Sequence, residues 1–191
     1  MISRDFIYSL LKTALERIQN KNWQQQVVEA WFLACTRGKW QSPDQLLKVP
    51  SSLLTDTCGI GLVAHTLAVT LGAAALAEQQ AACFHKMPYV IDFDVLYAGG
   101  LLHDVGKLLE IESDGRNGYR KSKNGKYLRH PVSGAILAAE VGLPESVQHV
   151  IACHARECED QPRRIETLLL HQADYAAFTP LVMKEKGMLI E

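Results

Sequence analysis

An adjacent histidine and aspartate, His103-Asp104, interrupt a run from Gly99 to Leu109 that is otherwise almost wholly apolar. Burying an imidazole and a carboxylate costs free energy unless both groups find partners. A divalent metal ion would satisfy both, because it accepts a neutral imidazole nitrogen and a carboxylate oxygen as ligands. A buried histidine–aspartate hydrogen bond without a metal is the simpler alternative, and the pair taken alone leaves both open.

Four further residues that could bind a metal lie in apolar segments with helix-like spacing. Along the chain they are His65, His130, His154 and Asp174. Taken alone, each histidine is more often a hydrogen-bonded core or surface residue than a ligand. With the central pair, the order becomes His, His-Asp, His, His, Asp. A set of imidazoles and carboxylates without thiolates suits Mn, Fe, Co, Ni, Zn or Mg better than copper, and the sequence does not choose among them.

This order of residues, together with the motifs His-Asp-x-Gly-Lys and His-Pro-x-x-Gly-Ala, resembles the pattern of the HD superfamily of metal-dependent phosphohydrolases. The resemblance covers about residues 55–180. The resemblance implies an all-α fold, an HD-domain helical bundle that binds one or two divalent ions. The implied ligands of one ion are His65, His103, Asp104 and Asp174, and Asp104 would bridge to a second ion held by His130 and His154.

The same resemblance implies a reaction at phosphorus. Metal ions would bind phosphate oxygens and activate a water molecule, with Asp104 at the centre of the site. Lys107, one helical turn beyond His103, would stabilise the charge on a phosphate oxygen. Asp104 and Lys107 are therefore the predicted catalytic residues. The simpler interpretation of Lys107 is a partly exposed lysine near a helix end, where cations are favoured.

A basic segment lies between the His-Asp pair and His130. Its dipeptides Asn117-Gly118 and Asn124-Gly125 are typical of tight hairpin turns. The stretch 116–129 contains no acidic residue. A solvated surface hairpin is the simpler interpretation, whereas a basic flap at the mouth of a metal site would attract a phosphate. The residues predicted to bind substrate are Lys107, Arg120, Lys121, Lys123, Lys126 and Arg129.

Apolar residues at helical spacing predict that most of the chain is helical. Proline residues suit the first turn of helices at Pro131 and Pro144. Two helices are expected at about 3–20 and 23–36, and a short one begins at Pro43. A long helix carries His65 and runs to about Phe84, and the next helix, capped by Asp92 or Asp94, carries His103 and Asp104. The last helix spans about 163–178 and is ended by Pro180.

These elements predict three regions. Residues 1–50 would be helices packed on the core or used for a protein partner, residues 51–180 the HD domain, and residues 181–191 a C-terminal tail.

The formal net charge of −1 gives no whole-chain electrostatic argument for binding to nucleic acid or to a membrane. The apolar stretch from Gly59 to Ala77 contains a histidine and threonines, which indicates a core helix and no membrane span.

The five cysteines are scattered and contain no Cys-x-x-Cys pair, which predicts reduced thiols in a cytoplasmic protein.

The leading functional hypothesis is a metal-dependent phosphohydrolase that acts on a phosphodiester or phosphomonoester of a nucleotide, cyclic dinucleotide or oligonucleotide. The partner would then be a phosphorylated small molecule or a nucleic acid. Two alternatives stay open: a di-iron oxygenase on the same scaffold, and a non-hydrolytic sensor or assembly module that retains its metal.

Overall fold

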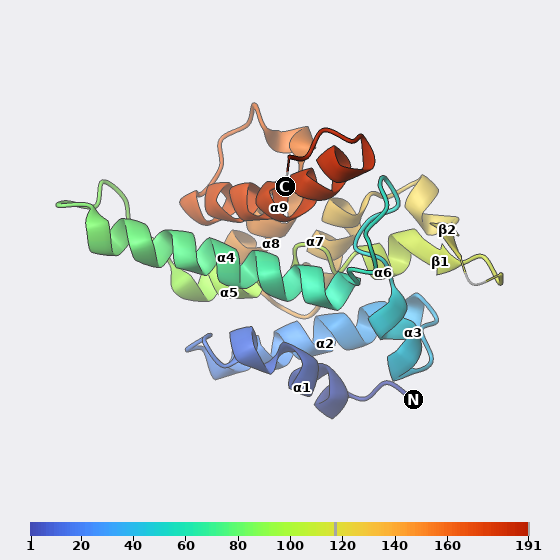
Figure 1. Ribbon diagram of the computed structural model, residues 1–191. Coiled ribbons are helices and arrows are strands. Elements are labelled where there is room, and N and C mark those ends of the chain that lie inside the picture. The colour runs from blue at the N-terminus through green and yellow to red at the C-terminus, as the bar shows by residue number, and fades with distance from the viewer. Residues whose placement is uncertain (117, 191) are drawn as a thin grey trace.

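The centre of the protein is a short helix, α5, in which every residue from Val95 to Leu102 is buried. A computed structural model describes residues 1–116 and 118–190 (Figure 1). α5 contacts helices from both ends of the chain, namely α1, α2, α4, α8 and α9. The elements are α1 (Arg4–Leu15), α2 (Lys21–Arg37), α3 (Pro43–Lys48), α4 (Leu62–Cys83), α5 (Phe93–Leu102), α6 (Lys107–Glu110), β1 (Ile111–Ser113), β2 (Tyr119–Lys121), η1 (Asn124–Lys126), α7 (His130–Glu140), α8 (Glu145–Cys153), η2 (Arg156–Cys158) and α9 (Ile165–Glu185).

The predicted all-α helical bundle with a short basic hairpin is confirmed. α4 and α5 form a middle layer, with α1 to α3 on one side and α7 to α9 on the other (Figure 1). β1 and β2 pair antiparallel directly after α6, with Ile111 opposite Lys121. Gly118 lies next to β2, and Asn117, the other residue of the predicted turn, lies outside the described residues.

Two tryptophans from the N-terminal region hold the backbone on either side of the His-Asp pair. The indole nitrogen of Trp31 donates to the carbonyl oxygen of Leu101 at 2.8 Å, and that of Trp40 donates to Leu108 at 2.8 Å. Both side chains are at least 93% buried, so these hydrogen bonds form away from water. The N-terminal helices therefore help to fix the segment that carries the candidate ligands.

Side-chain caps are observed at several helix starts, including the predicted cap at Asp92. Ser3 and Ser42 accept hydrogen bonds at the N-termini of α1 and α3, and Asp92 does so for α5 through Val95 N at 3.1 Å. Asp94 has a different role. Its two carboxylate oxygens accept from the backbone N–H groups of Gln19 and Asn20, at 2.6 and 2.9 Å, so it fastens the α1–α2 connection to α5.

Three local predictions for the part of the chain before α7 were wrong. The His-Asp pair does not lie inside a helix: α5 ends at Leu102, and residues 103–106 form a turn with hydrogen bonds from residue i to residue i−3, such as Val105 N to Leu102 O at 3.1 Å. The first helix ends at Leu15 and not near residue 20. The dipeptide Asn124-Gly125 lies in the short 3₁₀ helix η1 and not in a hairpin turn.

α9 continues through Pro180 to Glu185, although proline was expected to end it. An internal proline removes one N–H donor and crowds the carbonyl group of residue i−4, so contacts elsewhere along the helix must offset this cost. One such contact joins the last turn to the loop before α4, where the hydroxyl of Thr55 donates to the carboxylate of Glu185.

α4 is long and apolar enough to span a membrane by length and composition alone. Half of its most apolar window is buried inside the protein, where α4 packs against α9 and α5. A core helix of this kind passes the same test, which is therefore weak evidence for a membrane span.

Candidate metal centre

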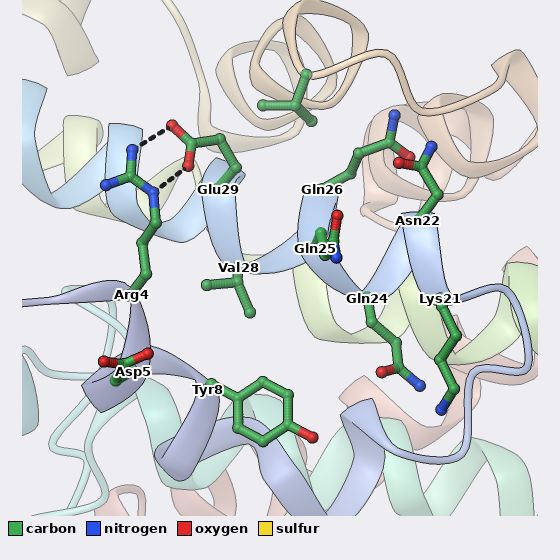
Figure 2. Close-up of a pocket in the computed structure, with 11 residues that line it drawn as sticks. Arg4, Asp5, Tyr8, Lys21, Asn22, Gln24, Gln25, Gln26, Val28 and Glu29 are labelled. Carbon is green, nitrogen blue, oxygen red and sulfur yellow. Dashed lines mark hydrogen bonds and ion pairs between the residues drawn. The ribbon is translucent and has the colours of Figure 1, made fainter.

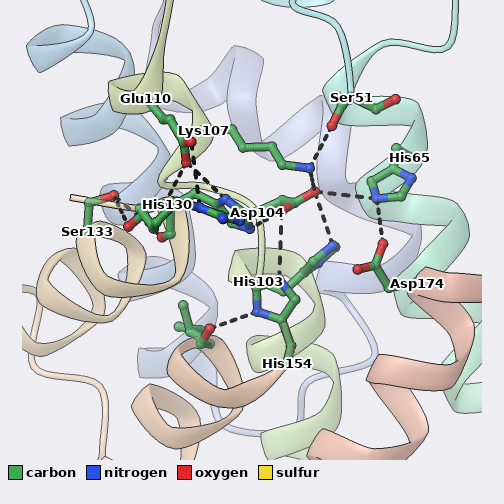
Figure 3. A network of polar contacts seen from close by, with 12 residues as sticks. Ser51, His65, His103, Asp104, Lys107, Glu110, His130, Ser133, His154 and Asp174 are labelled. Atoms are coloured by element: carbon green, nitrogen blue, oxygen red, sulfur yellow. Dashed lines mark hydrogen bonds and ion pairs between the residues drawn. The ribbon is translucent and has the colours of Figure 1, made fainter. Parts of the chain in front are cut away.

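Asp104 lies at the meeting point of four candidate histidine ligands, and its two oxygens face different pairs (Figure 3). Oδ2 lies 3.3 Å from His65 Nε2 and 3.4 Å from His103 Nε2. Oδ1 lies 3.2 Å from His130 Nε2 and 3.8 Å from His154 Nε2. This division matches the arrangement expected for a carboxylate that bridges two ions.

Asp174 completes the set from α9. Its Oδ1 lies 3.0 Å from His65 Nε2. The structure thus brings together all six side chains predicted as ligands, from α4, the His-Asp turn, the first residue of α7, the end of α8, and α9. Candidate ligand atoms lie within 4.8 Å of one another in three overlapping groups: His65, His103 and Asp104; His103, His154 and Asp174; and Asp104, His130 and His154.

The second ring nitrogen fixes the orientation of three of these histidines. His103 Nδ1 donates to the carbonyl oxygen of Gly100 at 2.7 Å, and His154 Nδ1 donates to that of Ile151 at 2.8 Å. A carbonyl oxygen can only accept, so Nδ1 carries the proton. In the neutral tautomer, the lone pair is then on Nε2, which faces Asp104. Metal-binding histidines in proteins show this same pattern.

Glu110 orients the third histidine, and sequence reasoning missed it. One of its oxygens accepts from both Nδ1 and the backbone N–H of His130, at 3.0 and 2.7 Å. Burial opposes the charged form of Glu110, but the hydrogen bonds from His130 outweigh burial and lower its pKa to about 2. The two residues are 20 positions apart in a loop-containing region, so no local spacing could have linked them.

Burial and neighbouring charges shift the pKa values of several residues in this centre. Burial opposes the charged forms of Asp104 and His65. Lys107 and His103 nevertheless hold the pKa of Asp104 well below its usual range, and the carboxylates of Asp104 and Asp174 raise the pKa of His65 to about 9. At His154, burial and the neighbouring imidazoles lower the pKa to about 3. His154 is therefore neutral at physiological pH, as a metal ligand must be.

The donor set fits a divalent metal. His65 Nε2, His103 Nε2 and Asp104 Oδ1 are buried, and within the described part of the chain none of them makes a well-aligned hydrogen bond. Buried polar atoms normally have such partners. Ligands bound to one ion at about 2.0–2.2 Å lie about 3–4 Å apart. The separations around Asp104 have this size, so shared ions would account for the three unpartnered atoms.

Lys107 is held at the edge of the cluster by two strong acceptors. Its ammonium donates to Asp104 Oδ2 and to the carbonyl oxygen of Ser51, both at 2.6 Å (Figure 3). An ammonium group has three N–H donors, so one remains after these two bonds. Lys107 therefore links the centre to the loop before α4, in addition to its predicted role at a phosphate oxygen.

A cavity of about 790 Å³ opens above the cluster. Asp104, His130, His154 and Asp174 lie at its base. The cationic side chains that line it come from four segments: Lys107 from α6, Lys121 from β2, Arg129 from the start of α7 and Arg156 from η2. Leu53, Leu54, Tyr175, Phe178 and Val182 form an apolar wall. Glu110 and Glu157 line it too, so the cavity combines a candidate metal site with side chains of both charges and with apolar surface.

Only part of the predicted basic flap reaches this cavity. Lys121 and Arg129 line it. Lys121 Nζ and Arg129 Nε lie 3.3 and 3.8 Å from Glu110 Oε1. Arg120 instead pairs with Glu112 at 2.8 Å, and Lys123 lines a separate hollow of about 450 Å³. Lys126, in η1, is absent from the lining of either cavity. Sequence reasoning missed Arg156, which follows His154 by two positions.

Another cavity, of about 680 Å³, lies between α1 and α2 (Figure 2). Glutamine side chains and the Arg4–Glu29 ion pair border it. None of the predicted ligands lines it. The candidate functional site is therefore the cavity above Asp104.

Gly106 in the His-Asp turn is required by the close approach of α7. A Cβ atom at this position would lie 2.2 Å from the carbonyl oxygen of His130 and 2.6 Å from Ser133 Oγ. We expect Gly106→Ala to lower the free energy of unfolding by about 1–3 kcal/mol, as other overpacking changes do. Urea unfolding of the metal-free protein measures this.

The matched control is Gly72→Ala in α4, where a Cβ would meet only Ala173 Cβ at an ordinary 3.7 Å. This change should leave stability equal or increase it by up to about 1 kcal/mol, because alanine favours helix. Equal stability of the Gly106 and Gly72 variants would contradict the packing described here.

Comparison with known proteins gives the family. The sequence model of a family described as HD domain matches residues 62–178, more than half of the chain. Ribonuclease Y from Acidothermus cellulolyticus (strain ATCC 43068 / DSM 8971 / 11B) is 38% identical over 84 residues, which make up 44% of this chain and 14% of that protein. The chain thus spans a small part of the length of this curated relative. No solved structure matches the chain.

Proposed function

Since this chain belongs to the HD domain family, we propose that it is a metal-dependent phosphohydrolase that cleaves a phosphodiester or phosphomonoester of a nucleotide, cyclic dinucleotide or oligonucleotide. One observation carries the proposal. The two oxygens of Asp104 face two pairs of histidine Nε2 atoms at the base of a cavity that is lined by cationic side chains.

The six side chains around Asp104 would hold one or two divalent ions. When bound, such ions supply Lewis acidity, since they neutralise charge on phosphate oxygens and make water nucleophilic at neutral pH. The carboxylate of Asp104 faces both halves of the cluster, the histidine pair at Oδ2 and the histidine pair at Oδ1, and offers them one shared negative charge. Glu110 keeps the His130 ring turned toward Asp104. The third N–H of Lys107 is the group we assign to a phosphate oxygen of the substrate.

The walls of the cavity support a substrate that carries both phosphate and an apolar or aromatic group. Lys121 and Arg156 supply positive charge, and Tyr175 and Phe178 supply aromatic surface. Aromatic side chains of this kind can stack on nucleobases. The name of the relative, Ribonuclease Y, supports a phosphodiester in RNA as one such substrate.

The test is hydrolysis by protein stripped with a chelator and then supplied with one divalent metal at a time. Bis-p-nitrophenyl phosphate reports diesterase activity, p-nitrophenyl phosphate reports monoesterase activity, and a short oligoribonucleotide tests the nucleic-acid substrate. The proposal expects hydrolysis that a metal restores. Uptake of oxygen by the iron-loaded protein without phosphate release would favour the oxygenase, and tight metal binding without either activity would favour the sensor.

The cationic lining predicts a specific change in substrate affinity. Replacing Lys121 and Arg156 together with glutamine should raise KM for a phosphodiester by about tenfold at low salt, because the variant loses two positive charges that would attract an anionic substrate to the cavity. Turnover should stay nearly constant. The same measurement at high salt should show a smaller difference, since salt screens exposed charges.

A matched control removes the same charge elsewhere on the basic segment. Lys123 and Lys126 do not line this cavity, so their double glutamine variant should keep the KM of the unmodified protein. An equal rise in KM for both double variants would mean that overall charge, and not the cavity lining, attracts the substrate.

A further inference from the structure

We propose that His171 is a positioning residue that holds the metal ligand His154 and the segment 154–159 against the centre. The inference rests on the proposed function, because it assigns His171 a role toward the same site. His171 lies on α9 one turn before Asp174, is 6% exposed, and matches none of the sequence motifs. Its polar ring is too deeply buried to be explained by contact with water.

The first contact is with the backbone of His154. His154 caps the C-terminus of α8, where helix carbonyl groups lack partners in the helix itself. His171 Nδ1 lies 2.6 Å from the carbonyl oxygen of His154 and donates to it. The next residue, Ala155, turns to an extended conformation at ψ 170°. His171 therefore fixes the backbone at the point where the chain leaves the helix.

This contact controls where the ligand atom of His154 lies. The ring of His154 is held through Nδ1 by the carbonyl oxygen of Ile151 at 2.8 Å, and its backbone is held by His171. Together the two hydrogen bonds place Nε2 at 3.8 Å from Asp104 Oδ1. Loss of the His171 hydrogen bond would leave a buried carbonyl unpaired and free the end of α8 to shift.

The second contact is at the other end of the segment. His171 Nε2 lies 3.7 Å from Glu159 Oε1, and the hydroxyl of Tyr175 donates to the same oxygen at 3.2 Å. The rings of His171 and Tyr175 are in contact, with centroids 4.5 Å apart and planes tilted by 36°. Between these two points lie Arg156 and Glu157, which line the cavity. His171 thus holds the start of this segment directly, and Tyr175, whose ring packs against His171, is bonded to its other end at Glu159.

The test compares two substitutions of His171. His171→Leu fills similar volume without a donor, whereas His171→Asn can place an amide N–H near the position of Nδ1. Calorimetric titration of the chelator-stripped protein with Co²⁺ should show affinity about 10–100-fold weaker for the leucine variant. The asparagine variant should recover most of this loss. The control is His149→Leu, a partly exposed histidine of α8 outside the cluster, which should bind Co²⁺ normally.

Hydrogen exchange of the metal-free proteins provides a second readout. The backbone N–H of Cys158 donates to Ala155 O at 3.2 Å, and that of Glu159 donates to Arg156 O at 3.1 Å. Both N–H groups should exchange faster in the leucine variant than in the asparagine variant. Equal exchange and equal Co²⁺ affinity in the leucine variant and the unmodified protein would overturn the inference. Equal loss in both His171 variants would also overturn it, because packing and not the donor would then matter.

Failure of the proposed function would look different. If the unmodified protein bound no Co²⁺, the phosphohydrolase proposal would fail. The hydrogen-exchange comparison would then still decide whether His171 holds the segment 154–159.

Discussion

Asp104→Asn should abolish both metal binding and hydrolysis while the protein stays folded. The change keeps the shape of the side chain but removes the one charge that both halves of the cluster share. We expect kcat/KM to fall by about 10³-fold or more, the size of effect seen when a group central to a catalytic unit is removed. Elemental analysis and circular dichroism of the same sample would show loss of metal with retained helix.

The charge change has a second consequence in the metal-free protein. His65 has a pKa of about 9 because the nearby carboxylates outweigh burial, and Asp104 is one of them. An NMR titration should therefore show a lower pKa for His65 in Asp104→Asn, so that the ring loses its proton at lower pH. Normal metal content and full activity in this variant would exclude Asp104 from the site. Glu112→Gln, on the exposed face of β1, is the control for removal of one carboxylate.

Lys107→Met should lower turnover by about 10²-fold, the loss typical of a single electrostatic stabiliser in an active site. Methionine keeps most of the length of the side chain and removes the charge. Metal content should not fall, because the ammonium beside Asp104 Oδ2 competes with a metal for that oxygen. Steady-state kinetics with elemental analysis measures both quantities.

Lys107 has a structural contact that the experiment must separate from catalysis. Its bond to Ser51 O also anchors the loop before α4. Limited proteolysis would report whether that loop has loosened in Lys107→Met. A loosened loop with normal turnover would limit Lys107 to anchoring. Lys123→Met, a lysine outside this cavity, should behave as the unmodified protein in both assays.

The ligand residues could be identified from the sequence because each is an unusual polar residue in an apolar segment. His65, His130 and Asp174 stand out against helices that otherwise bury apolar side chains. Their order also matches a known family, which carries the long-range information that spacing lacks. The fold class followed from helical periodicity for the same reason, since periodicity is a local property of the chain.

Features that depend on contacts between distant segments could not be predicted. The His-Asp pair lies in a turn because α5 ends where Trp31 and Trp40 hold the flanking carbonyl groups, about 70 positions away. Glu110 and His171 orient ligands through contacts that no spacing rule connects. The sequence predicts a single basic flap at the metal site, whereas the fold directs Lys121 toward the cavity and leaves Lys123 at another hollow.

The most direct test of the centre is anomalous diffraction from crystals grown with Mn²⁺. The data are recorded at a wavelength where the anomalous signal distinguishes manganese from lighter atoms. We expect anomalous density beside Asp104, with one peak on the Oδ2 side near His65 and His103 and, where a second ion binds, another on the Oδ1 side near His130 and His154. Absence of density at Asp104, in crystals where the six side chains keep their positions at millimolar Mn²⁺, would contradict the account.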